Sequence, residues 1–462
     1  MTERSGPYRP VRLPSPVRPS APLQARARCL ALQRARRRAR QRRRLLTSAV
    51  VLLAVALVAW SLSSSSPASR KKGTALVTEH VNLPVVELSD PVSRATGSVP
   101  SLPFPSSGEG AVAVLGSGVV AESRHEREVP IASMTKMMTA YLVLKAHPLS
   151  GDEKGPIFHF TARTHREWLG YAESDESNVD LVAGESLDER QLLEALLIPS
   201  ADNVADIFAR WVSGTEANFV SLMNKTALSL GMTETHYADA SGVDPHTVST
   251  AANQALLAAT LMENPVVRSI VRLQSVAFPV EGRVWNYNPA LGVDGIVGIK
   301  SGFTSEANGC LATAAWRRVG TSNKLLVAVA TGQVLGLDQA AQVDEDLLQA
   351  ATAHLRVESP FSSDHVARVV VPWTHRSVIA SIAAPLSLSE LGGLSLSVGV
   401  VGARVTARQA RDGWRKGAVV ADLVVRSQFG LVAIVPLRLD GRIHRPPSPI
   451  GVDSSSRLPA VS

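Results

Sequence analysis

Ser133 stands three positions before Lys136, where an apolar run that is typical of a helix begins. Residues three apart on a helix lie on one face, one turn from each other, so this hydroxyl and this amine can meet. A lysine in that position can take the proton of the serine, which turns a weak nucleophile into a strong one. A serine and a lysine at this spacing occur often by chance, and two motifs downstream make the pair more specific.

Both further motifs place polar residues inside regular patterns. Ser200–Asn203, with the sequence Ser-Ala-Asp-Asn, breaks a helical pattern in the way that a loop beside a pocket does. Lys300–Gly302, with the sequence Lys-Ser-Gly, falls within a strand pattern and presents a lysine and a hydroxyl. Gly302 has no side chain, so another segment of backbone can approach the strand there. The three motifs together predict a site with a nucleophilic serine.

In their order and spacing, the motifs at 133, 200 and 300 resemble those of the penicillin-binding serine D-Ala-D-Ala carboxypeptidases of low molecular mass. The flanking segments, such as Leu230–Tyr237, are also similar to that family, and the resemblance covers about residues 109–355. It implies an α+β fold, in which a β-lactamase/transpeptidase-like catalytic domain combines an antiparallel sheet with a helical subdomain.

The resemblance also implies catalytic roles for three residues. Ser133 would attack the carbonyl group between the last two D-alanines of a peptidoglycan stem peptide. Lys136 would act as the general base, and Ser200 would relay a proton toward the leaving D-alanine nitrogen. Water would then hydrolyse the acyl-enzyme. β-Lactam antibiotics, whose strained amide imitates the peptide, would acylate Ser133 and stay bound.

The same resemblance implies how the substrate is held. Lys300 and Ser301 would bind the terminal carboxylate, which is a charge-assisted pairing. The backbone N–H groups of Ser133 and Phe303 would form the oxyanion hole, and Gly302 would let the strand come close. The expected chemistry calls for no metal and no organic cofactor.

Two positions depart from the pattern of that family. Its third motif usually reads Lys-Thr-Gly, and Ser301 keeps the hydroxyl. Its second motif usually reads Ser-x-Asn, whereas Asp202 stands at the third position here and Asn203 follows it. An amide donates and accepts hydrogen bonds, a carboxylate only accepts them, and an anion near Lys136 favours the charged form of the amine. Asn203 takes the role of the amide if the loop shifts by one residue.

The elements around these motifs predict two domains. Strand patterns at 111–122 and 295–330 bracket a helical middle, which is an α+β arrangement with a sheet packed on helices. Helices are expected over residues 133–146, 187–211, 217–230, 250–263 and 338–356. After about residue 358, short strand candidates separated by turn signals indicate a small all-β domain.

The N-terminal region has a different composition. Residues 1–44 hold fourteen arginines and one acidic residue, and residues 45–62 are almost wholly apolar. Eighteen helical residues extend about 27 Å, close to the ~30 Å of a bilayer core. The arginines predict a cytoplasmic N-terminus and a catalytic domain outside the cell membrane. A cleaved signal peptide is the alternative, although no clean A-x-A site follows the apolar run. This membrane segment explains the basic arm better than binding to nucleic acid does.

The expected organisation therefore has six parts. They are a disordered basic arm (1–44), a transmembrane anchor (45–62), a Ser/Pro-rich tether (63–108), the penicillin-binding catalytic domain (109–357), a C-terminal β-rich domain (358–443) and a disordered tail (444–462). Because the predicted membrane separates Cys29 from Cys310, they form no disulfide and no metal cluster. The sequence carries no signal for an oligomeric state.

Three functions fit these features. The first is a membrane-anchored carboxypeptidase that trims peptidoglycan. The second keeps the acyl-serine chemistry but changes the substrate, as in a D,D-endopeptidase or a β-lactamase. The third is a penicillin-binding scaffold with little turnover, which the replacement of asparagine by Asp202 keeps open.

Overall fold

The computed structural model describes residues 83–89, 100–172, 177–361, 363–374, 376–383, 386–391, 396–448, 450, 452 and 456–461. The chain divides into two units, 1–79 and 80–462, and every described residue belongs to the second unit. The predicted arm and the predicted anchor, residues 45–62, lie outside the described residues. Within the described part, none of the helices combines the length and the apolar character that crossing a bilayer requires.

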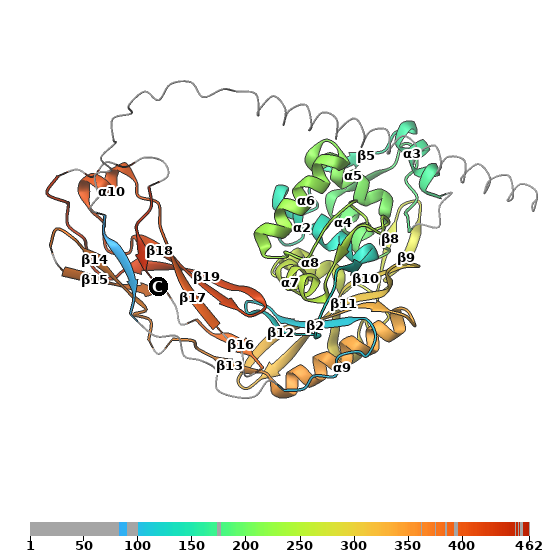
Figure 1. Cartoon of the computed structure of the whole chain (residues 1–462). Coiled ribbons are helices and arrows are strands. Elements are labelled where there is room, and N and C mark those ends of the chain that lie inside the picture. Colours follow the sequence, from blue (N-terminus) through green and yellow to red (C-terminus); the bar gives the residue numbers. More distant parts are fainter. Residues whose placement is uncertain are drawn as a thin grey trace, which may run out of the picture. The chain divides into compact units, whose positions relative to one another are not determined.

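The catalytic domain is built on a five-stranded antiparallel sheet in the order β10-β11-β12-β2-β3. Its strands are β2 (Glu109–Val114), β3 (Gly118–Glu122), β10 (Ile296–Thr304), β11 (Asn308–Val319) and β12 (Ser322–Gln333). The middle of β12 is an unbroken buried run, because both faces of the sheet are covered. Figure 1 shows α9 (Leu337–His354) along one face of this sheet and the helices of the helical subdomain over the opposite face.

Several helices of the helical subdomain begin or end at recognisable capping residues. Its elements are η1 (Ala132–Thr135), α2 (Lys136–Ala146), α3 (Ala162–Ala172), α4 (Glu189–Leu197), α5 (Asp202–Ser213), α6 (Glu216–Leu230), α7 (Ala251–Leu261), α8 (Pro265–Val271) and η2 (Val293–Gly295). Asp188 forms a capping box with Gln191 at the start of α4. Gly231 ends α6 in the left-handed conformation that glycine adopts readily. Three short two-stranded ladders lie among these elements in the chain: β4 (Val129–Pro130) with β7 (Val248–Ser249), β5 (Ile157–His159) with β6 (Ser186–Asp188), and β8 (Ser275–Phe278) with β9 (Gly282–Trp285).

The second domain is a seven-stranded sheet in the order β17-β18-β19-β15-β14-β1-β20. Its strands are β1 (Val85–Leu88), β14 (Ala367–Val371), β15 (Arg376–Ile382), β17 (Leu396–Gly402), β18 (Val419–Ser427), β19 (Gly430–Leu439) and β20 (Ala460–Val461). A separate two-stranded ladder pairs β13 (Arg356–Glu358), which follows the catalytic domain, with β16 (Leu388–Glu390), which comes after β15. The domain also contains one short helix, α10 (Ala407–Asp412), which the expectation of an all-β domain did not include.

Two predicted boundaries differ from the structure. The predicted tether, 63–108, contains β1, which pairs with β14, and Val86 is fully buried in the core of the β domain. The predicted tail, 444–462, contains β20, which pairs with β1 in parallel. Both strands are too short for their alternation to stand out from a Pro- and Ser-rich background, and partners far away in the sequence stabilise them. The predicted α+β class, with a β domain after the catalytic domain, is confirmed.

Candidate active site

Ser133 lies in the single turn of η1, and Lys136 begins α2 directly after it. A 3₁₀ turn places residues i and i+3 above one another, so the two side chains meet more directly than they would in an α-helix. The Lys136 Nζ lies 2.8 Å from the Ser133 Oγ. The sequence motif thus becomes a direct contact between an amine and a hydroxyl.

Lys136 is fully buried and has three hydrogen-bond partners. Besides Ser133, its Nζ donates to Asp202 Oδ1 at 2.6 Å and to the carbonyl oxygen of Ser241 at 2.8 Å. The Asp202 carboxylate and the Ser241 carbonyl oxygen can only accept hydrogen bonds, so each of them binds one N–H group of Lys136. The remaining hydrogen-bonding direction of the Lys136 Nζ points to the Ser133 hydroxyl, and a neutral amine would direct its lone pair there.

The loop does not shift by one residue to bring Asn203 to the lysine. Asp202, the first residue of α5, makes the contact. The Asn203 amide is turned to Val179, donating to its carbonyl oxygen at 2.8 Å and accepting from its N–H at 3.4 Å. The alternative in which Asn203 replaces the usual asparagine is therefore wrong, and a carboxylate occupies that position.

The second and third motifs meet at Ser200 and Lys300. The Lys300 Nζ donates to the Ser200 Oγ at 2.9 Å and to the Ser301 carbonyl oxygen at 2.7 Å. Burial of Lys300, together with the positive charge of Lys136, lowers the pKa of Lys300 well below its ordinary value, and Asp202 opposes the shift. Ser200 connects α4 to α5 with a φ of 67°, which is an uncommon conformation for a residue with a side chain.

The expected close approach at Gly302 is confirmed. A Cβ atom added to Gly302 would lie 2.9 Å from the backbone nitrogen of Ser133 and 3.1 Å from the Ile131 carbonyl oxygen. Glycine therefore lets the edge strand β10 contact the turn that carries the nucleophile. Ser301 is buried, whereas Phe303 is 59% exposed. The contacts join Ser133, Lys136 and Asp202 in one group and Ser200 with Lys300 in another, and the charges of Lys136 and Asp202 act on Lys300.

One contributor to the site was missed in the sequence: the Asp239–Asp244 loop, which supplies the Ser241 carbonyl oxygen. Asp239 organises it, because its Oδ2 accepts from the backbone N–H groups of Gly242, Val243 and Asp244. Gly242 packs so tightly that an added Cβ would lie 1.8 Å from the Ala132 carbonyl oxygen. The signal in the sequence was Asp239 with Ser-Gly two residues later, which is typical of a side chain that folds its own loop.

No metal centre accompanies these residues in the part of the chain that the structure describes. There, no group of three His, Cys, Asp or Glu side chains is placed to hold a metal ion. The charged groups at the candidate site are two lysines and one carboxylate, which suit acid–base and nucleophilic chemistry.

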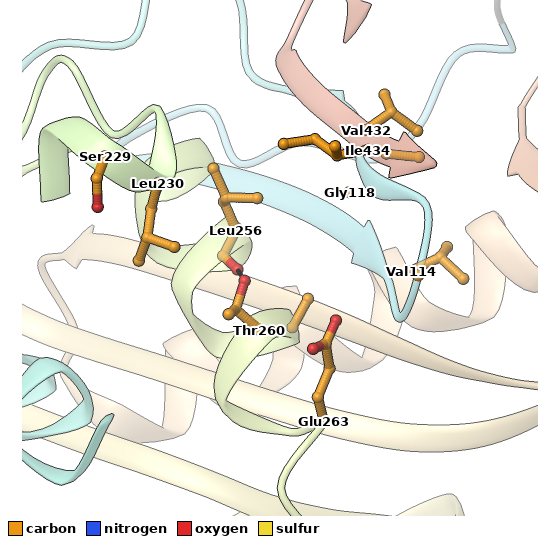
Figure 2. A pocket seen from close by; sticks show the side chains of 12 residues that line it. Val114, Gly118, Ser229, Leu230, Leu256, Thr260, Glu263, Val432 and Ile434 are labelled. Carbon is orange, nitrogen blue, oxygen red and sulfur yellow. Dashed lines mark hydrogen bonds between the residues drawn. The ribbon is translucent and has the colours of Figure 1, made fainter. Parts of the chain in front are cut away.

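A separate cavity of about 180 Å³ contains none of the candidate residues. Figure 2 shows that Leu256 and Thr260 of α7 contribute to it, together with Val432 and Ile434 of β19. It is a partly apolar seam where the β18–β19 hairpin approaches the helices, and it lacks a nucleophile–base pair. The predicted nucleophile and base therefore lie in the Ser133 group and not at this seam.

Comparisons with known proteins agree with this geometry. A family model described as D-alanyl-D-alanine carboxypeptidase, Peptidase S11, matches residues 112–334. The D-alanyl-D-alanine carboxypeptidase DacB2 of Mycobacterium tuberculosis is 30% identical over 249 residues, which cover 52% of this chain and 80% of that protein. A D-alanyl-D-alanine endopeptidase of Pseudomonas aeruginosa is 29% identical over 264 residues, covering 52% of this chain and 77% of that protein.

The coverage of relatives differs from protein to protein. DacF of Bacillus subtilis, a D-alanyl-D-alanine carboxypeptidase, is 28% identical over 233 residues. The match covers 49% of this chain and only 57% of the length of DacF. Among solved structures, penicillin binding protein 5 from Haemophilus influenzae aligns with a TM-score of 0.56 and 19% identity, covering 76% of this chain and all of that chain. This likeness confirms the predicted transpeptidase-like fold.

Proposed function

Because the chain belongs to the D-alanyl-D-alanine carboxypeptidase family, a family of serine peptidases, we propose that it removes the terminal D-alanine from peptidoglycan stem peptides. The observation that carries this proposal is the 2.8 Å contact between the buried Lys136 Nζ and the Oγ of the half-buried Ser133. A base within hydrogen-bond reach of a hydroxyl is the arrangement that nucleophilic catalysis by serine requires.

The proposed reaction has two stages. Lys136 in its neutral form accepts the Ser133 proton as Oγ bonds to the carbonyl carbon between the two D-alanines. The carbon–nitrogen bond then breaks, and a proton delivered through Ser200 neutralises the leaving amine. In the second stage water attacks the resulting ester, releases the shortened peptide and returns the proton to Ser133. A β-lactam acylates the same oxygen, but its leaving nitrogen stays attached to the acyl group.

Substrate binding is assigned to β10. Lys300 and Ser301 would bind the terminal carboxylate, and the backbone N–H groups of Ser133 and Phe303 would stabilise the oxyanion. One oxyanion-hole donor typically contributes about 3–4 kcal/mol to the transition state. Two observations support this assignment: β10 is at the edge of its sheet, and Gly302 brings it against the turn of Ser133.

The proposal includes a location. An apolar segment at 45–62 with arginines before it supports a single membrane anchor, with the catalytic domain on the outer side of the cell membrane. Peptidoglycan is assembled on that side, so the proposed substrate and the proposed location agree.

A parallel assay tests the function. The purified protein is incubated with a stem pentapeptide, a cross-linked peptide dimer and a penicillin. Release of D-alanine from the pentapeptide supports the carboxypeptidase. Cleavage of the dimer alone indicates an endopeptidase, the activity named for the Pseudomonas relative. Acylation without peptide turnover indicates a scaffold, which the contact between Asp202 and Lys136 keeps as a second candidate.

Intact-mass spectrometry tests whether Ser133 is the residue that penicillin acylates. Intact-mass spectrometry after incubation with penicillin is expected to show one adduct on the parent protein and none on Ser133→Ala. An equal adduct on both proteins would remove every acyl-serine version of the proposal.

A further inference from the structure

The β domain contains a cavity of about 340 Å³ whose lining is rich in arginine. It is formed by α10, by the turn that follows this helix and by the segment after β19. Its lining residues are Thr406, Arg408, Gln409, Asp412, Gly413, Arg415, Ala418 and Arg442. None of them belongs to the candidate active site, and nothing in the proposed peptidase reaction uses them.

The walls of this cavity are held in place by backbone contacts. Trp414 and Ile443 exchange two backbone hydrogen bonds of 2.9 Å, and Trp414 is almost completely buried. Gly413 has a φ of 79°, and a Cβ atom there would lie 2.3 Å from the Ile443 carbonyl oxygen. Arg415 directly follows Trp414 in the chain, and Arg442 directly precedes Ile443. The two arginines therefore start from backbone positions that are set before any ligand arrives.

The charges at the cavity do not balance. Asp412 is the sole acidic residue of the lining, and its carboxylate lies 3.9 Å from the Arg408 guanidinium and 3.1 Å from that of Arg411. No hydrogen bond or ion pair of the Arg415 or Arg442 side chain is found within the described residues. Three guanidinium groups thus line one cavity with a single carboxylate among them.

The whole domain shares this excess of positive charge. Residues 83–89, which contain β1, and residues 363–461 together hold twelve Arg and Lys residues and seven Asp and Glu residues, a net charge of +5. Residues 109–357 hold eighteen basic and twenty-nine acidic residues, a net charge of −11. An anionic ligand approaching the chain is therefore drawn to the β domain and repelled by the catalytic domain.

We propose that this cavity is a binding site for a phosphate diester, held by the guanidinium groups of Arg408, Arg415 and Arg442. Guanidinium groups present paired N–H donors that match phosphate oxygens, and such charge-assisted bonds are the stronger ones. The volume is within the range of sites for small ligands, roughly 300–1,000 Å³, and leaves room for a glycerol or sugar substituent on the phosphate. An apolar ligand would leave the guanidinium groups unpaired, and a cation would be repelled.

Two sources could supply a phosphate diester: the head group of an anionic lipid and a soluble polymer of glycerol phosphate. Both share the chemistry that the cavity recognises. The site is independent of the acyl-serine reaction, so the two proposals stand or fall separately.

The test compares two double variants of the full chain. Arg415→Gln/Arg442→Gln removes two exposed guanidinium groups that line the cavity, and Arg376→Gln/Arg426→Gln removes two that are also exposed but lie outside its lining in the same domain. All proteins keep the arginines of residues 1–44, so a difference in affinity between the variants measures binding at the cavity. Calorimetric titration with glycerophosphoglycerol, at constant ionic strength, is expected to give an affinity at least about tenfold weaker for the cavity variant, because two charge-assisted bonds are lost.

The control variant is expected to match the parent. A competition arm in detergent solution identifies the source: displacement of glycerophosphoglycerol from the parent chain by short-chain phosphatidylglycerol but not by poly(glycerol phosphate) indicates a lipid head group, and the reverse indicates a soluble polymer. Equal affinities of the cavity and control variants for the soluble diester would overturn the proposal. The absence of saturable binding by the parent chain would overturn it as well.

Discussion

The Lys136 Nζ lies 2.6 Å from Asp202 Oδ1, and both side chains are buried. The pair connects the motif that carries the nucleophile with the loop that carries Ser200. Removing one member of a buried pair leaves a charge without compensation and is strongly destabilising. Substitutions at Asp202 should therefore keep a polar group of the same shape.

Asp202→Asn is expected to acylate at least as fast as the parent and up to about tenfold faster, which corresponds to about 1.4 kcal/mol in the barrier. The amide oxygen still accepts from Lys136, the negative charge that attracts the ammonium form is gone, and an N–H donor is gained. The measurement is the acylation rate with a fluorescent penicillin. Asp152→Asn, at an exposed position of the same domain, serves as the control. A large fall in the rate for Asp202→Asn would show that the carboxylate itself is needed.

Gly302→Ala is expected to slow acylation by about 100-fold, the effect of displacing catalytic groups by roughly 1 Å. The new methyl group would lie 2.9 Å from the Ser133 nitrogen, so the strand or the turn has to move. Gly399→Ala is the matched control, because it also lies in a strand and has no atom within 4 Å of its added Cβ. The idea fails if both variants acylate as fast as the parent.

The pH dependence of substrate binding should reveal Lys300. Burial and the charge of Lys136 lower the pKa of Lys300 well below 10.5, so the ammonium form that binds a carboxylate is lost as the pH rises through this lowered value. The KM for a peptide with a free C-terminal carboxylate is expected to rise over that interval. A peptide with an amidated C-terminus is the control, since groups other than Lys300 act on both substrates. Identical pH profiles for the two peptides would contradict the proposed role of Lys300.

Stability should depend on pH through Glu126, which accepts from the Ala252 N–H at the start of α7 at 2.9 Å. Burial, with smaller contributions from Glu109 and Glu122, raises the pKa of Glu126 from 4.5 to about 8. Between these values the folded state keeps a proton that the unfolded state has released, so its contribution to stability is complete below pH 4.5 and is lost as the pH rises toward 8.

Glu126→Gln removes this titration and keeps an acceptor for Ala252. Between pH 4.5 and about 8, the slope of the unfolding free energy against pH is expected to be smaller than in the parent. The difference corresponds to at most about one proton bound by the folded state and not by the unfolded state. Urea unfolding at several pH values measures the slope. Glu128→Gln, at an exposed position nearby, should leave the slope as it is in the parent. An unchanged slope in Glu126→Gln would assign the proton to another group.

Much of the catalytic domain could be predicted because its signals are local. Helices such as α6 end at glycine, and the strands β10 to β12 are long runs with few breaks. Placing Ser133, Lys136 and Lys300 in these elements required only spacing and pattern. Their roles in the reaction remain predictions, since contacts between side chains do not measure chemistry.

Other features could not be predicted because they depend on distant partners. The Ser241 carbonyl oxygen contacts Lys136, but a backbone acceptor has no signature in the residue type. The choice between Asp202 and Asn203 depends on where α5 begins and on the hydrogen bonds to Val179. β1 has only four residues and is stabilised by strands from the far end of the chain.

The position of β1 has a mechanical consequence. The chain passes through the β domain before it enters the catalytic domain, and β1 is held between β14 and β20. Tension applied to the chain ahead of residue 83 would load these two ladders in shear, so their backbone hydrogen bonds would have to break before the force reached the catalytic sheet. The catalytic domain lies between β1 and β14 in the chain and is therefore shielded from pulling at its N-terminal end, so the contact between Ser133 and Lys136 can keep its geometry while the chain is under tension.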